Sequence, residues 1–162
     1  MELTVTLACE ADLDRICEIY AAARAFMAQN GNPTQWGDSY PAISMLREDI
    51  RERHLYVIRQ GETIRGVFYL NQYEDPTYAA IYNGSWHCDE PYAVIHRIAA
   101  DGSGGIVKCA VDFALTASPY LRIDTHQDNT VMQRVLQKIG FQFCGTIYVE
   151  DGTPRLAYDL KV

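Results

Sequence analysis

The chain has 162 residues, of which 48% are hydrophobic, and this is typical of one compact domain with a sizeable core. A formal net charge of −7 excludes the broad basic surface of nucleic-acid-binding proteins. No apolar stretch approaches the roughly 18 residues of a membrane span, and the first residues lack a basic segment followed by an apolar core. We therefore expect a soluble, cytoplasmic protein, a single domain over 1–162, with neither a membrane nor a nucleic-acid partner.

The predicted elements of the first half alternate between strand and helix patterns. Alternating apolar residues predict a strand over 3–7, and an apolar stripe predicts a helix over 11–29 with Asp12 as its cap. A short helix over 42–53 leads to strands over 55–59 and 63–71, joined by a turn at Gly61. The aromatic segment 72–92 follows and is interpreted as a lid or pocket wall.

Glycines organise the second half. Gly102, Gly104 and Gly105 lie between an apolar run at 94–100 and a helical run at 106–117. Such a turn exposes backbone N–H groups at a helix N-terminus, where the helix dipole favours an anionic phosphate. The sequence therefore predicts a phosphate cradle.

Asn129 opens a further helix after a strand over 120–125, and Gly140 is the predicted C-cap of that helix. Two strands, over 141–150 and 155–160, follow and are joined by a hairpin turn at Asp151-Gly152. We expect this hairpin to end the chain as an antiparallel edge.

This order of elements resembles the acetyl-coenzyme A binding half of the GNAT family of N-acetyltransferases, most specifically in the stretch RIDTHQDNTVMQRVLQKIGFQFCG. The resemblance extends over nearly the whole chain. It implies a mixed α/β (α+β) fold of the acyl-CoA N-acyltransferase type, with a central, mostly antiparallel sheet splayed between its fourth and fifth strands and helices on both faces. Two positions depart from the family pattern. The glycine loop is contracted and lacks its leading Arg or Gln, and Leu136 stands where the family usually has a tyrosine acid.

The resemblance implies acetyl-CoA as co-substrate, bound by Ile98, Ala99, Ala100, Gly102, Ser103, Gly104, Gly105, Ile106 and Asn129. The backbone of 98–100 would pair with the pantetheine arm as if with another strand. Gly104, Gly105 and Ile106 would donate N–H groups to the pyrophosphate, and the Asn129 amide would contact the pantetheine. Ser103 either adds a hydroxyl donor or caps the following helix.

Acetyl transfer to an amine requires a base, because a primary amine with a pKa near ~10.4 is mostly protonated at neutral pH. His96 is the first candidate, since such enzymes often place a base on this strand. Asp124 and His126 are the second, because alternate residues of a strand share one side and would form a base with its orienter. The structural alternatives are a packed His96 and an ion pair of Asp124 with Arg97 or Arg122.

Aromatic side chains in two loops are candidates for the acceptor pocket, namely Trp36, Tyr40, Tyr78, Tyr82 and Trp86. They would hold an amine by cation–π contact and exclude water, or they pack in the core or at a homodimer interface. A homodimer therefore stays open.

Five cysteines without paired short spacing favour reduced thiols over a disulfide framework. The adjacent residues His87, Cys88 and Asp89 would diverge on an extended chain, so we expect no metal. With no convincing nucleophile beside a base, the sequence predicts direct acetyl transfer to a small-molecule or amino-acid-like amine. Leu136 and the contracted loop leave open an acyl-CoA sensor or an inactive module of the same fold, and a purely structural protein would bind no coenzyme.

Overall fold

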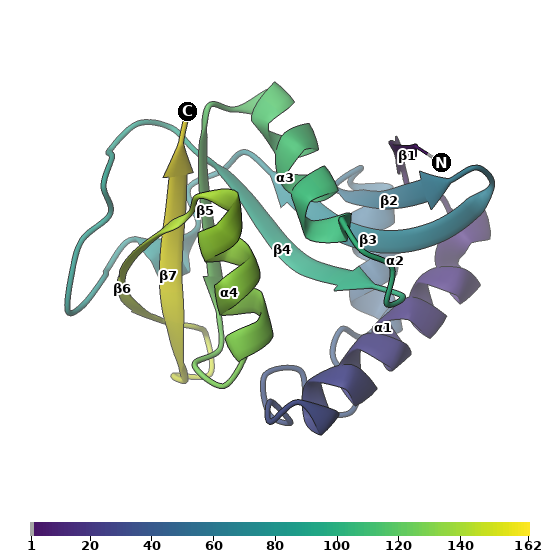
Figure 1. Ribbon diagram of the computed structural model, residues 1–162, viewed down its shortest axis with the longest axis horizontal. Coiled ribbons are helices and arrows are strands. Elements are labelled where there is room, and N and C mark those ends of the chain that lie inside the picture. Colours follow the sequence, from purple (N-terminus) through teal and green to yellow (C-terminus); the bar gives the residue numbers. More distant parts are fainter. Residues whose placement is uncertain (1) are drawn as a thin grey trace. The chain divides into compact units, whose positions relative to one another are not determined.

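The computed structural model describes residues 2–162 as a mixed α/β structure (Figure 1). Its elements are β1 (Leu3–Leu7), η1 (Glu10–Asp12), α1 (Leu13–Gln29), α2 (Ile43–Arg51), β2 (Leu55–Gln60), β3 (Thr63–Asn71), η2 (Pro76–Tyr78), β4 (Ala93–Ala100), α3 (Ile106–Ala117), β5 (Tyr120–Thr125), α4 (Thr130–Ile139), β6 (Gln142–Tyr148) and β7 (Pro154–Lys161). The strands form one open sheet in the order β1-β2-β3-β4-β5-β7-β6, in which β4 and β5 pair in parallel. The remaining registers, of β1 with β2, β2 with β3, and β7 with β5 and β6, are antiparallel. The predicted fold class is confirmed.

Two compact units divide the chain. The N-terminal unit comprises the residues up to Leu70 together with His96–Phe113, and the C-terminal unit comprises Asn71–Ile95 together with Ala114–Val162. The strand β4 and the helix α3 each contribute residues to both units. The single domain expected over 1–162 stays a prediction.

Helices cover both faces of the strands in the N-terminal unit. On one face, Ile16 and Tyr20 of α1 and Leu46 of α2 pack with Val57 and Val67 in a fully buried cluster. On the other face, the ring of Phe113 in α3 lies 5.0 Å from that of Tyr56 and 6.1 Å from that of Phe68. Alternation along β2 and β3 therefore sends successive side chains to opposite helical layers.

In the C-terminal unit, β7 lies between β5 and β6, so β6 forms the edge of the sheet. This corrects our expectation that the final hairpin as a whole forms an edge: its second strand is internal. Figure 1 shows α4 over β5 and β7, and Gly140 at the end of α4 packs near Leu160. The opposite face carries Tyr78, Val94 and Cys144, with Trp86 packed against them. The segment 72–92 thus covers this face.

Local capping follows the sequence at α4 and departs from it at α1. The side-chain oxygen of Asn129 accepts a hydrogen bond from the N–H of Met132 (3.1 Å), and Gly140 has a φ of 122°, as expected of a cap pair. The Asp12 carboxylate, in contrast, accepts from the N–H of Cys9 (3.0 Å) and from Arg59 (3.0 Å). Asp12 therefore anchors the chain before α1 and makes no capping hydrogen bond to that helix.

At Gly66, β3 packs so closely against the start of α3 that an added methyl group should destabilise the protein. A methyl group added at Gly66 would lie 2.6 Å from Cγ2 of Ile106 and 3.2 Å from the carbonyl oxygen of Ala99. We expect Gly66→Ala to lower the free energy of unfolding, measured by urea denaturation, by about 1–3 kcal/mol through overpacking. Gly104→Ala is the control, because its methyl group would meet no atom within 4 Å. A Gly66→Ala protein as stable as this control would contradict the packing described.

Candidate active site

The glycine turn of the N-terminal unit is open to solvent and follows β4 directly. A Cβ added at Gly102 or Gly104 would meet no atom within 4 Å, and Gly102 and Gly105 have positive φ angles of 101° and 80°. The first α-helical hydrogen bond of α3 runs from the N–H of Cys109 to the carbonyl of Gly105 (3.0 Å). The N–H groups of residues 106–108 precede this bond and have no carbonyl partner within the helix. The turn therefore presents backbone donors at a helix N-terminus, as predicted.

Two arginines lie beside this turn and bind its acidic residue. The Asp101 carboxylate accepts hydrogen bonds from Arg65 (3.1 Å), Arg15 (3.4 Å) and the N–H of Ser103 (2.9 Å). Burial by itself would raise the pKa of Asp101, but the hydrogen bonds from Ser103 and Arg65 outweigh it and hold that pKa below its usual value. Arg15 and Arg65 were missed in the sequence, where they lie 86 and 36 residues from Asp101 without a local signal.

Arg97 gives β4 an irregular backbone just before the residues expected to pair with the pantetheine. Its φ is 53°, in the left-handed region. The buried hydroxyl of Tyr20 donates to the carbonyl of Arg97 (2.6 Å), and the guanidinium donates to Asp49 (2.8 Å) while lying 4.4 Å from the ring centre of Tyr69. These contacts hold the β4 backbone in an irregular conformation next to Ile98.

The candidate bases lie in different units. His96, in the N-terminal unit, is partly exposed and its ring centre is 5.9 Å from that of Tyr69. In the C-terminal unit, the Asp124 carboxylate accepts a hydrogen bond from the buried Tyr78 hydroxyl (2.7 Å), and Nδ1 of His126 accepts from the N–H of Asp128 (3.0 Å). Asp124 and His126 therefore each have a partner of their own.

Among the described residues, Asp124 forms no ion pair with Arg97 or Arg122, which was the structural alternative. Arg97 binds Asp49, and Arg122 donates to the carbonyl of Cys88 (2.8 Å). Burial raises the pKa of Tyr78 well above its usual value, and the negative charge and hydrogen bond of Asp124 add to this rise, so this phenol stays protonated. Burial, with Arg155 nearby, lowers the pKa of His126.

The aromatic candidates for the acceptor pocket also lie in different units. In the N-terminal unit, Trp36 and Tyr40 are partly exposed, with ring centres 6.2 Å apart, and Trp36 also contacts the ring of Tyr20. In the C-terminal unit, Tyr78 is buried against Trp86, with ring centres 5.1 Å apart. The guanidinium of Arg122 lies 4.2 Å from the ring centre of Trp86 and so occupies its π surface.

The segment 72–92 does form a pocket wall. A cavity of about 830 Å³ in the C-terminal unit is lined by its aromatic and acidic side chains, together with Arg122 and Lys161. Tyr82 lies outside this lining and is half exposed, with its ring 5.4 Å from that of Tyr148.

Leu136 and Cys144 occupy positions where an acetyltransferase could have a proton donor or a nucleophile. Leu136, at the position of the family's usual tyrosine, is fully buried and offers no proton. Sγ of Cys144 lies 3.3 Å from Nδ1 of His87, a cysteine–histidine contact that sequence reasoning missed because 57 residues separate the two. Burial and hydrogen bonding to Asp159 raise the pKa of Cys144 to about 12, so the thiol is not activated as a nucleophile.

Among residues 2–162, every helix is too short or too polar to span a bilayer.

Comparisons with known proteins agree with this geometry. A family model described as an acetyltransferase (GNAT) domain matches residues 2–142. A GNAT-family acetyltransferase from Streptococcus agalactiae is 29% identical over 99% of this chain and 95% of its own, with a TM-score of 0.89. No curated protein shows significant sequence similarity.

More distant structures share the fold. One is a GNAT-family acetyltransferase from Listeria monocytogenes, 17% identical over 100% of this chain and 96% of its own, with a TM-score of 0.72. Another, from Salmonella typhimurium, was solved with its cofactor acetyl-CoA and is 14% identical over 98% of this chain and 93% of its own, with a TM-score of 0.63. Because the family model matches well over half of the chain, this protein belongs to the GNAT acetyltransferase family and is an acyltransferase.

Proposed function

We propose that the protein transfers an acetyl group from acetyl-CoA directly to a small-molecule or amino-acid-like amine. The observation that carries this proposal is the open glycine turn between β4 and α3, where side chains at Gly102 and Gly104 would fill otherwise empty space. An anionic diphosphate fits such a site, because the helix N-terminus supplies N–H donors and a partial positive charge. Asp101 beside it is bound to both Arg15 and Arg65, which offset the negative charge of its carboxylate.

The residues present fit the coenzyme in distinct roles. Gly104, Gly105 and Ile106 donate backbone N–H groups to the pyrophosphate, and the backbone of 98–100 pairs with the pantetheine arm. Ser103 donates its N–H to Asp101, which orders the turn. Asn129, in the C-terminal unit, caps α4 through its side-chain oxygen, and its contact with the pantetheine stays a prediction. When bound, acetyl-CoA supplies the thioester that carries the acetyl group.

His96 takes the proton from the acceptor amine. It lies on β4 immediately before Arg97 and two residues before the pantetheine-pairing backbone, and imidazole is the side chain that most often serves as a general base. Trp36 and Tyr40, partly exposed in the same unit, are the aromatic residues best suited to hold the acceptor. The rings of Tyr78 and Trp86 pack against each other, and the guanidinium of Arg122 lies over Trp86, which suits a supporting role.

Direct transfer requires no covalent acetyl-enzyme. The protonated Cys144 thiol is a poor nucleophile despite its contact with His87, because only the thiolate attacks readily. The buried Leu136 removes the usual acid for the departing thiolate. Its loss is tolerable, since a thiol with a pKa near ~8.5 leaves without prior protonation far more readily than an alkoxide.

Leu136 also favours a second candidate, an acyl-CoA sensor of the same fold. Both proteins bind the coenzyme, but only the enzyme releases free thiol when an amine is present. A screen of amines and amino-acid derivatives with acetyl-CoA, followed by a thiol reagent, separates the two. We expect amine-dependent thiol release. If none of the amines in the panel causes thiol release, the sensor is the better account.

Coenzyme binding through the turn is tested by Gly104→Val. Acetyl-CoA binds the folded state, so it should raise the melting temperature of the wild-type protein as its concentration increases. A valine at Gly104 would project into open space without straining the turn, and would block close approach of phosphates to the backbone. We expect at least tenfold weaker binding by calorimetry in a protein that remains folded. Unchanged affinity would place the cradle elsewhere.

The identity of the base is tested by His96→Ala with Asp124→Asn and His126→Ala as matched variants. Loss of a general base lowers turnover by roughly 10²–10⁴-fold, so we expect His96→Ala to reduce kcat strongly while coenzyme affinity is retained. A base must be neutral, so the wild-type pH–rate profile should fall on the acidic side, and His96→Ala should lose this limb.

The alternative pair predicts a different profile. Because burial and Arg155 lower the pKa of His126, this imidazole gains its proton only at a lower pH than an ordinary histidine. A base at His126 would therefore place the acidic limb below the usual imidazole range. A limb there that disappears in His126→Ala, with an intact rate in His96→Ala, would show that His96 is not the base.

A further inference from the structure

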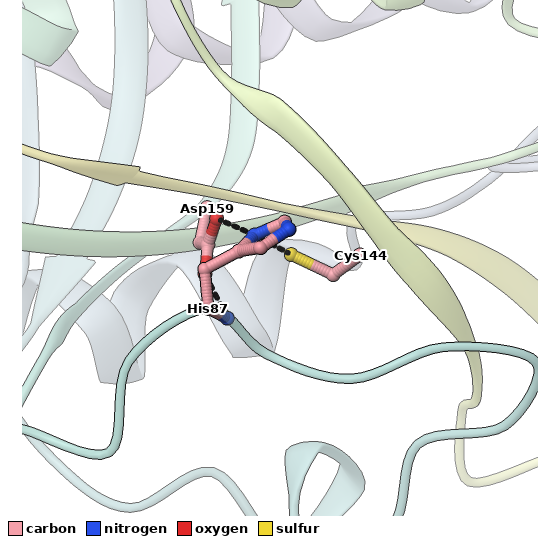
Figure 2. Close-up of side chains that lie close together, drawn as sticks. All are labelled: His87, Cys144 and Asp159. Carbon is pink, nitrogen blue, oxygen red and sulfur yellow. Dashed lines mark hydrogen bonds and ion pairs between the residues drawn. The ribbon is translucent and has the colours of Figure 1, made fainter.

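Three side chains with metal-ligand atoms converge on one face of the C-terminal unit (Figure 2). His87 comes from the loop 79–92, Cys144 from β6 and Asp159 from β7. Nδ1 of His87 lies 2.8 Å from Oδ1 of Asp159 and 3.3 Å from Sγ of Cys144, and the three ligand atoms all lie within 4.8 Å of one another. Cys144 and Asp159 are buried, whereas the His87 side chain is 46% exposed.

The arrangement differs from a nucleophilic triad. In a triad the histidine uses one ring nitrogen for the nucleophile and the other for the carboxylate. Here both Cys144 and Asp159 approach Nδ1 of His87. The three groups therefore point at one shared volume, as the ligands of a cation do, and they form no relay.

Two hydrogen bonds to Oδ2 hold the carboxylate of Asp159 in a fixed orientation. Oδ2 accepts hydrogen bonds from the Tyr120 hydroxyl (2.8 Å) and from the backbone N–H of His87 (2.9 Å), so Oδ1 faces the cluster. Bound metals commonly depend on such hydrogen bonds to their ligating carboxylates. Arg122 is the nearby cation, and its Nε donates to the Tyr120 oxygen (3.1 Å), so this phenol stands between Arg122 and Asp159.

We propose that His87, Cys144 and Asp159 bind one divalent cation of the zinc and cobalt class. The nitrogen, sulfur and oxygen donors suit that class, and a neutral imidazole, a thiolate and a carboxylate together neutralise a 2+ charge. Binding forms one bond from the cation to each ligand atom and releases the Cys144 thiol proton to solvent, with no change of oxidation state. A water molecule fills the fourth position from the exposed side of His87.

The spacing of the ligand atoms is close to what the cation requires. Bonds of about 2.0 Å to nitrogen and oxygen and about 2.3 Å to sulfur, in tetrahedral geometry, separate nitrogen from oxygen by about 3.3 Å and nitrogen from sulfur by about 3.5 Å. The nitrogen–oxygen and nitrogen–sulfur pairs therefore have to open by only a few tenths of an ångström, and the sulfur and oxygen atoms lie within 4.8 Å of each other. His87 lies on a loop and is half exposed, so this side chain accommodates the movement. The cation would join the loop 79–92 to β6 and β7.

The test is titration of the chelator-treated, full-length protein with Co²⁺. Tetrahedral cobalt bound to a thiolate absorbs in the visible range and gives a sulfur-to-metal charge-transfer band in the near ultraviolet. We expect one Co²⁺ per chain with both features, displacement of the cobalt by Zn²⁺, and a Zn²⁺-dependent rise in melting temperature.

The variants decide which residues bind. Cys144→Ser and His87→Gln should each abolish the charge-transfer band or weaken Co²⁺ binding at least tenfold. Cys88→Ser, adjacent to His87, is the matched control and should leave the band unchanged. Because the buried Cys144 variant risks misfolding, the half-exposed His87→Gln protein, checked by circular dichroism, provides the decisive comparison. Absence of the band in the wild-type protein, or a band and a Co²⁺ affinity that are unchanged in His87→Gln, would overturn the proposal.

Discussion

The left-handed backbone of Arg97 is the constraint on which the proposed coenzyme strand depends. A φ of 53° at a residue with a side chain costs about 1–2 kcal/mol, so surrounding contacts must maintain it. Tyr20 donates to the Arg97 carbonyl from the buried face of α1, and Asp49 of α2 and Tyr69 of β3 hold the guanidinium. Three elements thereby fix one peptide of β4. The residues that follow, 98–100, owe their direction to this anchoring, because the strand continues from it into the glycine turn.

Electrostatics and steric openness act together at that turn. The helix N-terminus attracts an anion only if its N–H groups are accessible, and accessibility depends on glycines without Cβ atoms. An acidic Asp101 in the same turn would repel phosphate, but Arg15 and Arg65 bind its carboxylate and offset its negative charge. Gly66 complements this arrangement, since its missing side chain lets Ile106 pack directly on β3. One glycine thus positions α3, whereas the others expose its first turn.

Local patterns predicted the elements well because periodicity, caps and glycine turns are local signals. The bounds of β1, β3, α3 and β5 were predicted correctly, and Asn129 and Gly140 cap α4 as expected. Contacts between distant segments were not predictable in this way. Asp124 binds Tyr78, Asp101 binds two arginines, and His87 meets Cys144, each across 36 residues or more. The internal position of β7 was missed for the same reason. A hairpin signal shows that β6 and β7 pair with each other, but it does not show which of the two strands pairs with β5.

Hydrogen–deuterium exchange of the backbone, with and without acetyl-CoA, measures the central claim most directly, because it reports protection amide by amide. The account predicts that the coenzyme slows exchange at Ile98–Ala100, through strand-like pairing with the pantetheine, and at Gly104–Ile106, through hydrogen bonds to the pyrophosphate. It also predicts that the amides of the segment 72–92, which forms a wall of the cavity in the C-terminal unit, are not the principal site of protection. Slowed exchange confined to that cavity, with β4 and the glycine turn unchanged, would contradict it.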